Sequence, residues 1–328
     1  MTTPLFIGNM DHLVKKHKQK CQRRLRTLFP GLSPSAINFS SFDYLNLASH
    51  SYVKEQGIAY SLKWGSGPLP SRPLPDYEHA LKKTEDLLAK FLGHETVTFY
   101  EHDPYLFSKL PSLNDKPLIS THSIVRKTGS LICFDELKQI KESSNSLLAV
   151  DDTLSFCMLG THGFGLSANR PCVDLILGNF NKCFGSYVSY IACSKQLKAQ
   201  LFDKLPSLHK EQYIPPLFLG MIDATINLLP SMQAERKKLL NLKQLLYTSL
   251  RKTPFNPSET KAPFISLPFI NPLEMKNLHL HLADSSFIPG LFSSTLSFSP
   301  TLKLTEKNIT DLFQTFSSYK NLPQFEAL

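Results

Sequence analysis

The sequence of 328 residues has no apolar run of about 20 residues, the length that a helix needs to cross a bilayer. Its first residues also lack the apolar segment of a signal peptide, so we expect a cytoplasmic protein without a membrane partner. The six cysteines are scattered singly, without a CxxC pair, and this favours reduced thiols over a disulfide framework. There is no repeat of fixed period and no low-complexity tail.

Positive charge exceeds negative charge, with a formal net charge of +9 and its densest cluster at residues 15–26. Such an excess could attract nucleic acid. No recognised nucleic-acid-binding motif accompanies it, so we interpret residues 10–28 as a solvated basic helix and expect no nucleic-acid partner. A basic surface would equally suit an anionic cofactor or a coenzyme A thioester.

The order of apolar segments indicates an α/β protein. The length allows one large core and a smaller second domain. Short apolar strands alternate with helices, which is typical of a mainly parallel sheet covered on both faces. We expect strands at 97–100, 118–120, 146–150, 174–178, 187–193, 264–267 and 296–298, and helices at 77–92, 135–143, 217–251 and 306–319.

Two polar residues follow strands of this predicted sheet. Asp151 ends the strand 146–150, and Lys182 follows the strand 174–178. Ligands of open α/β sheets bind beyond the carboxyl ends of the strands, so both positions fall where a site is expected. A lysine buried beside apolar residues tends to be neutral, as a nucleophilic amine must be. Alternatively, Lys182 is a surface lysine in a turn and Asp151 caps a helix.

Other candidate sites have less support. His279 and His281 alternate with leucine, which predicts that both lie on one face of a strand, but a zinc site would need further ligands and we expect no metal. Gly163-Phe164-Gly165 lacks the strand-to-helix G-x-G-x-x-G context of a dinucleotide site. No Ser-His-Asp order has a supporting context.

Four segments, in order along residues 37–200, resemble the α-oxoamine synthases, the pyridoxal-phosphate (PLP) enzymes typified by 8-amino-7-oxononanoate synthase. Residues 38–48 are similar to N-F-x-S-N-D-Y-L-G-L-A, and Gly65-Ser66-Gly67 with Ser71-Arg72 is similar to G-x-G-x-x-x-S-R. Residues 150–165 resemble V-D-D-A-H-x-x-G-x-L-G-x-x-G-x-G. Residues 174–185, DLILGNFNKCFG, resemble the lysine segment D-I-x-x-G-T-x-S-K-x-x-G.

This resemblance implies the fold type I architecture of PLP-dependent transferases, with a mainly parallel sheet, helices on both faces and a smaller α+β domain. The implied domains are an N-terminal segment at 1–48 that packs with the small domain, a large PLP-binding domain at 49–230 and a small domain at 231–328. It also implies a homodimer with its sites at the subunit interface.

The implied reaction joins an amino acid to an acyl thioester with loss of carbon dioxide, as in the 8-amino-7-oxononanoate synthase of biotin biosynthesis. Lys182 would hold PLP covalently. Asp151 would pair with the pyridine nitrogen and make the ring an electron sink. Asn179 and Asn181 replace the family's threonine and serine near the phosphate, and asparagine can still donate hydrogen bonds there.

Several positions depart from the family pattern. Arg126 replaces a serine and adds positive charge that could replace lost phosphate contacts, and Gln212 replaces a threonine donated by the neighbouring subunit. Leu154 replaces the histidine that contacts the cofactor's phenolic oxygen. His102-Asp103-Pro104 replaces the phosphate-binding turn, and the stacking histidine has no counterpart in register.

The small domain also departs from the family. The run Thr295-Leu296-Ser297-Phe298-Ser299 lacks the arginine that would bind the substrate carboxylate. The sequence therefore leaves two functions open. One is a PLP-dependent acyltransferase, and the other is a catalytically degenerate family member that acts as a binding or regulatory partner.

Overall fold

The computed structural model describes residues 36–67, 74–205, 208, 214–255, 257 and 259–319. The helix predicted over residues 10–28, the pair Ser71-Arg72 and residue Gln212 lie outside the described residues. Among the helices that are described, none is long and apolar enough to cross a membrane. The described cysteines, Cys133, Cys157, Cys172, Cys183 and Cys193, are free thiols.

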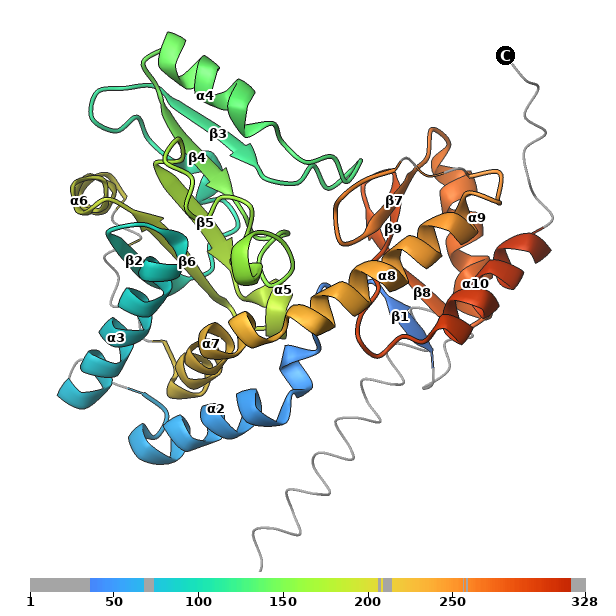
Figure 1. The fold of residues 1–328 in the computed structure, drawn as a ribbon, viewed down its shortest axis with the longest axis horizontal. Helices are drawn as coiled ribbons and strands as arrows, with labels where there is room; N and C mark the ends of the chain where they lie inside the picture. Colours follow the sequence, from blue (N-terminus) through green and yellow to red (C-terminus); the bar gives the residue numbers. More distant parts are fainter. Residues whose placement is uncertain are drawn as a thin grey trace, which may run out of the picture.

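The larger sheet of the described chain has the strand order β2-β6-β5-β4-β3 (Figure 1). β3, β4 and β5 pair in parallel, whereas β6 lies antiparallel between β5 and β2. All strands except β6 therefore point the same way, and the predicted mainly parallel sheet is confirmed. The strands are β2 (Thr96–Glu101), β3 (Leu118–His122), β4 (Leu147–Asp151), β5 (Leu175–Asn179) and β6 (Val188–Cys193).

Helices cover both faces of this sheet, which explains the almost continuous apolar sequence of β4 and β5. Leu148 and Val150 of β4 pack in one cluster with α3 and α7, whereas Leu147 and Ala149 pack with α6 on the opposite face. The helices of this part are α2 (Ser51–Trp64), α3 (Pro75–Leu92), α4 (Phe134–Ser143), α5 (Asn181–Phe184), α6 (Lys195–Lys204) and α7 (Pro216–Leu228).

The helix α2, which was not among the helices predicted from the sequence, packs closely along α7. A Cβ atom on Gly57 would lie 2.9 Å from the carbonyl oxygen of Leu217, and one on Gly220 would lie 2.5 Å from the carbonyl oxygen of Gln56. Glycine at both positions therefore lets the two helix backbones approach each other. A 3-10 turn, Leu47–Ser49, precedes α2.

A second sheet contains segments from distant parts of the chain, in the order β1-β8-β9-β7. β1 pairs in parallel with β8, and β9 lies antiparallel to β8 and β7. The ring of Phe39 in β1 lies 5.9 Å from that of Phe298 in β9. The elements are β1 (Ile37–Phe39), β7 (Ile265–Pro268), β8 (Phe287–Phe292), β9 (Thr295–Phe298), α8 (Gln233–Leu250), α9 (Pro272–Asp284) and α10 (Glu306–Ser318).

The continuous helix predicted over residues 217–251 is wrong, because the chain breaks between α7 and α8. A 3-10 turn, Leu229–Ser231, separates them and contains Pro230. Proline has no amide hydrogen, and its ring clashes with the preceding helical turn, so an α-helix does not pass through it without distortion. In Figure 1, α8 then runs from the side of the larger sheet to the second sheet.

The strand predicted around His279 and His281 is also wrong. Both residues lie in α9, which Asn271 caps by accepting a hydrogen bond from the amide of Leu273. Residues two apart on a helix do not face the same side. His279 is buried, whereas Nε2 of His281 lies 3.0 Å from the carbonyl oxygen of Thr315. No group of His, Cys, Asp or Glu in the described part of the chain could hold a metal ion.

Glu85 of α3 is a buried carboxyl group that makes folding pH-dependent. Its side chain is 7% exposed, and Oε1 accepts a hydrogen bond from the amide of Phe99 at 2.8 Å. Burial raises the pKa of Glu85 from 4.5 to about 7. Between these values the folded protein keeps a proton that the unfolded chain has lost. The free energy of unfolding therefore falls as the pH rises over this interval, and it stays low above it.

We expect Glu85→Gln to stabilise the protein at about pH 8, by up to about 3 kcal/mol, and to change little at about pH 4. Glutamine can still accept the hydrogen bond from Phe99, and it carries no charge that burial penalises. Urea unfolding at both pH values measures the difference. Glu78→Gln, an exposed change on the same helix, is the control. Equal stability of wild type and Glu85→Gln at both pH values would contradict the prediction.

Candidate active site

Asp151 and Lys182 lie at the carboxyl ends of adjacent parallel strands. Asp151 is the last residue of β4 and pairs in register with Leu177 of β5. β5 ends at Asn179, and the single helical turn α5 follows with Lys182 as its second residue. The fold therefore places the two residues at the same edge of the sheet, where the sequence predicted a site.

Lys182 occupies an environment that disfavours its positive charge. Its Nζ atom lies 5.4 Å from the centre of the Phe42 ring, a contact that attracts a cation, but two stronger effects act against the charge. Burial, with a contribution from the nearby charge of Arg126, lowers the pKa of Lys182, and the carboxylate of Asp151 opposes this effect. The neutral amine, which is the nucleophilic form, is therefore more populated than in a lysine exposed to water.

Asp151 is kept ionised by hydrogen bonds at the edge of the sheet. It accepts one from the amide of Thr153 at 3.0 Å, and Nδ1 of His122 lies 3.2 Å from Oδ2. Burial alone would raise the pKa of Asp151, but the hydrogen bonds from His122 and Thr153 outweigh it, and the pKa is lowered. The carboxylate can therefore keep a proton on a neighbouring basic nitrogen.

His122 was missed by the sequence interpretation. It ends β3 and lies opposite Asp151 in the parallel register. Its hydrogen bond with Asp151 raises the pKa of His122, and its ring lies 5.0 Å from that of Phe107. The signal in the sequence was a histidine just beyond a predicted strand. It could be connected with Asp151 only once the strand order was known.

Asn179 lies in the turn before Lys182 and already has protein partners. Its Oδ1 atom accepts a hydrogen bond from the amide of Asn181 at 2.5 Å, and its Nδ2 lies 2.7 Å from Nδ1 of His102. The same ring nitrogen lies 3.0 Å from the hydroxyl of Ser189. Burial lowers the pKa of His102, and the charge of Lys182 lowers it further. These contacts place His102 beside the lysine, on the β2 side of the sheet.

Arg126 reaches the site from the opposite side. Its guanidinium carbon lies 5.3 Å from the ring centre of Phe42 and 4.1 Å from that of Phe292 in β8. The carbonyl oxygen of Arg126 accepts a hydrogen bond from the hydroxyl of Ser266 in β7 at 3.0 Å. Arg126 therefore lies where the turn after β3 meets the second sheet, near Lys182. Gln212, the remaining predicted site residue, lies outside the described residues.

The loop that follows Asp151 is held by its neighbour Asp152, which is fully buried. Its carboxylate accepts hydrogen bonds from the amide of Ser167 at 2.8 Å and from the hydroxyl of Ser155. A Cβ atom on Gly165, where φ is +97°, would lie 2.2 Å from Asp152. Glycine is therefore required at this position. Leu154 packs against the core in this loop.

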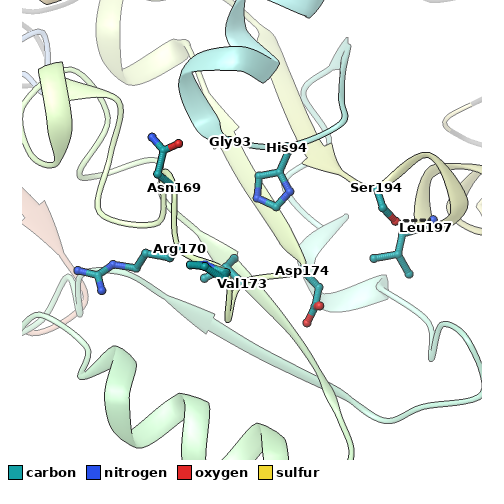
Figure 2. A pocket seen from close by; sticks show the side chains of 9 residues that line it. Gly93, His94, Asn169, Arg170, Val173, Asp174, Ser194 and Leu197 are labelled. Carbon is teal, nitrogen blue, oxygen red and sulfur yellow. Dashed lines mark hydrogen bonds between the residues drawn. The ribbon is translucent and has the colours of Figure 1, made fainter.

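A cavity of about 480 Å³ lies elsewhere on the larger sheet. Figure 2 shows His94, Asn169 and Asp174 around it. Asp174 precedes β5 and Lys182 follows it, so the cavity is at the opposite end of that strand. It is distinct from the site of Lys182 and Asp151.

Comparison with known proteins agrees with this geometry. The family described as "Aminotransferase class I and II" matches residues 107–289, more than half of the chain. The chain belongs to this family. A putative 8-amino-7-oxononanoate synthase from Desulfosudis oleivorans is 27% identical over 286 residues, covering 68% of this chain and 74% of the relative. The resemblance to the α-oxoamine synthases is thus confirmed.

Two enzymes of known structure share the fold of this chain. The 8-amino-7-oxononanoate synthase of Francisella tularensis has a TM-score of 0.73 at 18% identity, covering 87% of this chain and 98% of that enzyme. A variant of serine palmitoyltransferase from S. paucimobilis, solved with a bound PLP–myriocin aldimine, has a TM-score of 0.74 at 14% identity, and the match covers 86% of both chains. The predicted fold type I architecture is therefore confirmed.

Proposed function

We propose that this chain is a PLP-dependent acyltransferase of the α-oxoamine synthase type, which condenses an amino acid with an acyl thioester and releases carbon dioxide. The observation that carries the proposal is the placement of Lys182 and Asp151 beyond the carboxyl ends of adjacent parallel strands. One is a lysine with a lowered pKa, and the other is a carboxylate with a lowered pKa. Membership of the aminotransferase family supports the same chemistry.

The donor set at the site fits PLP. The cofactor needs an amine for its aldehyde, an anion for its ring nitrogen and hydrogen-bond donors or cations for its phosphate. Lys182, Asp151 and the side-chain amide groups of Asn179 and Asn181 would supply these contacts, with Gln212 as a further contact. When bound, PLP supplies an aldehyde that condenses with amines and a protonated ring that withdraws electrons from the substrate α-carbon.

The residues of the chain would share the remaining steps. Asp151, kept anionic by His122 and Thr153, would hold the proton on the ring nitrogen. The ε-amino group of Lys182, when it is free of the cofactor, would remove and return the proton at the substrate α-carbon. Its lowered pKa suits this role, because a base works best when its pKa is near the working pH.

The finer assignments belong to the same proposal. We place the chain in the cytoplasm, in a step of the kind that makes 8-amino-7-oxononanoate for biotin. The names of relatives, such as the 8-amino-7-oxononanoate synthase of Gluconacetobacter diazotrophicus, support the product of this step. The sequence-based domain bounds of 1–48, 49–230 and 231–328 are retained. Phe39 supports these bounds, because it shares a core cluster with residues after 241, whereas Phe42, Tyr44, Leu45 and Leu47 pack in the cluster of the larger sheet.

Cofactor capture tests this function without knowledge of the acyl donor. The purified protein should turn yellow with PLP, and borohydride should fix one cofactor to the peptide that contains Lys182. The lysine can form this bond because its amine is partly neutral and borders the site. If the protein takes no label from saturating PLP, the acyltransferase proposal fails, and the degenerate binding partner becomes the better description.

We also propose a homodimer, because α2, which packs against α7, exposes two large apolar side chains. Leu62 is 83% exposed and Ile58 is 54% exposed, one helical turn apart. Analytical ultracentrifugation should give a dimer, and Leu62→Asp should shift it toward monomer, because a charge would be buried in the interface. Leu273→Asp, a change at a 62% exposed leucine of α9, is the control. A wild-type protein that is monomeric at every concentration would contradict this prediction.

A further inference from the structure

Arg126 has a guanidinium group without an ionic partner, although it lies in a partly buried position. Its Nε atom is buried and has no hydrogen-bond partner. None of the ion pairs formed within the described ranges includes Arg126. The flanking rings of Phe42 and Phe292 hold the group by cation–π contacts. An unpaired, partly buried guanidinium that is held in place is suited to bind an anion.

The backbone of Arg126 is fixed independently of its side chain. Val125 and Ser130 are joined by a backbone hydrogen bond at 2.9 Å, which closes the turn around Arg126. The hydroxyl of Ser266 binds the carbonyl oxygen of Arg126, and the hydroxyl of Thr260 binds that of Gly129. The turn is thus attached to the second sheet, and the guanidinium is positioned before any ligand arrives.

Arg126 also lies close to Lys182. The Nζ atom of Lys182 and the guanidinium of Arg126 both contact the ring of Phe42, at 5.4 Å and 5.3 Å. The charge of Arg126 contributes to the lowered pKa of Lys182. An anionic group on a molecule that reacts at Lys182 would therefore come within reach of the guanidinium.

The strand order places Asn179 and Arg126 on opposite sides of Lys182, so the two residues would bind different anionic groups. Asn179, at the end of β5, turns toward His102 and Ser189 on the β6 and β2 side of the sheet. Arg126 comes from the turn after β3, on the other side of Asp151. The phosphate contacts proposed at Asn179 and Asn181 thus lie on one side of Lys182. Arg126 lies on the other side, next to the second sheet.

We infer that Arg126 binds the α-carboxylate of the amino-acid substrate, rather than the phosphate of the cofactor. The inference rests on the proposed function, and it revises the phosphate role that the sequence predicted for this residue. A guanidinium can bind a carboxylate through two parallel hydrogen bonds. The strand Thr295–Phe298, next to Phe292, has no basic residue that could take this role.

The test compares two amines on PLP-loaded protein, alanine and ethylamine, which differ by the carboxylate. Their apparent affinities are read from the change in cofactor absorbance. In Arg126→Met we expect alanine to bind about 10- to 100-fold more weakly, the usual loss for a charge-assisted pair. At a pH above the labelling midpoints of both proteins, ethylamine affinity and the PLP concentration for half-maximal borohydride labelling of Lys182 should not change.

Two further variants separate a direct role from a structural one. Arg126→Lys keeps the charge, so the pH midpoint of labelling at Lys182 should stay at the wild-type value. In Arg126→Met the midpoint should move to higher pH, because removing a cation raises the pKa of Lys182. Arg170→Met is the matched control and should change neither alanine affinity nor the labelling midpoint. The guanidinium of Arg170 also lies 4.1 Å from a phenylalanine ring, that of Phe134.

The outcomes distinguish the assignments. A higher PLP requirement in Arg126→Met, with equal losses for alanine and ethylamine, would overturn the inference in favour of a phosphate contact. Unchanged alanine affinity in a variant that is still labelled at Lys182 would also overturn it, and the proposed function would survive. A wild-type protein that takes no label would overturn both.

Discussion

Replacing Lys182 with alanine should abolish the label that borohydride fixes to PLP-treated protein. The bond to the cofactor forms at the Nζ atom, and alanine has no amine that could replace it. We expect the labelled peptide to disappear from the mass spectrum, with no new labelled lysine. The visible absorbance of the PLP-treated protein should fall at the same time.

The fold should survive this change, because the packing of α5 comes from other residues. Cys183 and Phe184 are buried on this turn, and Phe180 before it is fully buried. The ring of Phe180 lies 5.8 Å from that of Phe99. The free energy of unfolding of Lys182→Ala should therefore be close to that of wild type, which urea unfolding would show.

Lys243 is an internal control for the chemistry. It is another buried lysine whose pKa is lowered by burial, but it lies in α8 and donates a hydrogen bond to the carbonyl oxygen of Thr260. If a lowered pKa alone directed the label, Lys243 would also react. A label on Lys243, or a label that persists in Lys182→Ala, would contradict the assignment.

The strand ends that carry Lys182 and Asp151 could be predicted from the sequence for a physical reason. A strand buried on both faces is apolar at nearly every position, so the first polar residue after it marks its end. Asp151 and the segment after Gly178 stand out in this way. Parallel neighbours end at the same sheet edge, and that placed both residues in one site.

The partners of these residues could not be predicted in the same way. His122 is separated from Asp151 by a helix and meets it only through the parallel pairing of β3 with β4. His102 meets Asn179 because β6 lies between β2 and β5. Strand order is a property of the packed sheet, and no periodicity in a single segment encodes it.

Local periodicity failed where tertiary packing decided the structure. Alternation of His279 and His281 with leucine has a period of two, yet Asn271 and Pro272 begin a helix there. The parallel pairing of β1 with β8 joins segments about 250 residues apart, which a local pattern does not report. The sequence therefore predicted only two strands of the second sheet and the final helix that packs beside it.

Replacing Asp151 with asparagine should separate cofactor capture from proton transfer. Asparagine has nearly the same shape and can still accept the hydrogen bond from the amide of Thr153. It has no negative charge, so it cannot hold a proton on the ring nitrogen as the carboxylate does. We expect labelling at Lys182 to continue and exchange of the alanine α-proton, measured in heavy water, to fall by about 100-fold.

The pH dependence of labelling gives this prediction a second readout with a defined sign. The charge of Asp151 raises the pKa of Lys182, in opposition to burial and to Arg126. Without that charge the pKa of Lys182 falls, so the amine becomes neutral at lower pH. The midpoint of labelling in Asp151→Asn should therefore move to lower pH, opposite to its shift in Arg126→Met.

His122→Gln is the matched control for Asp151→Asn, because it removes the imidazole beside Asp151 and leaves the carboxylate in place. The pKa of Asp151 should rise, since His122 helps to lower it. At about pH 8 the carboxylate would still be ionised, so the loss of α-proton exchange should be much smaller than in Asp151→Asn. If Asp151→Asn exchanges the α-proton at the wild-type rate, the carboxylate does not act on the cofactor ring. If α-proton exchange falls as much in His122→Gln as in Asp151→Asn, this exchange requires the imidazole as well as the carboxylate.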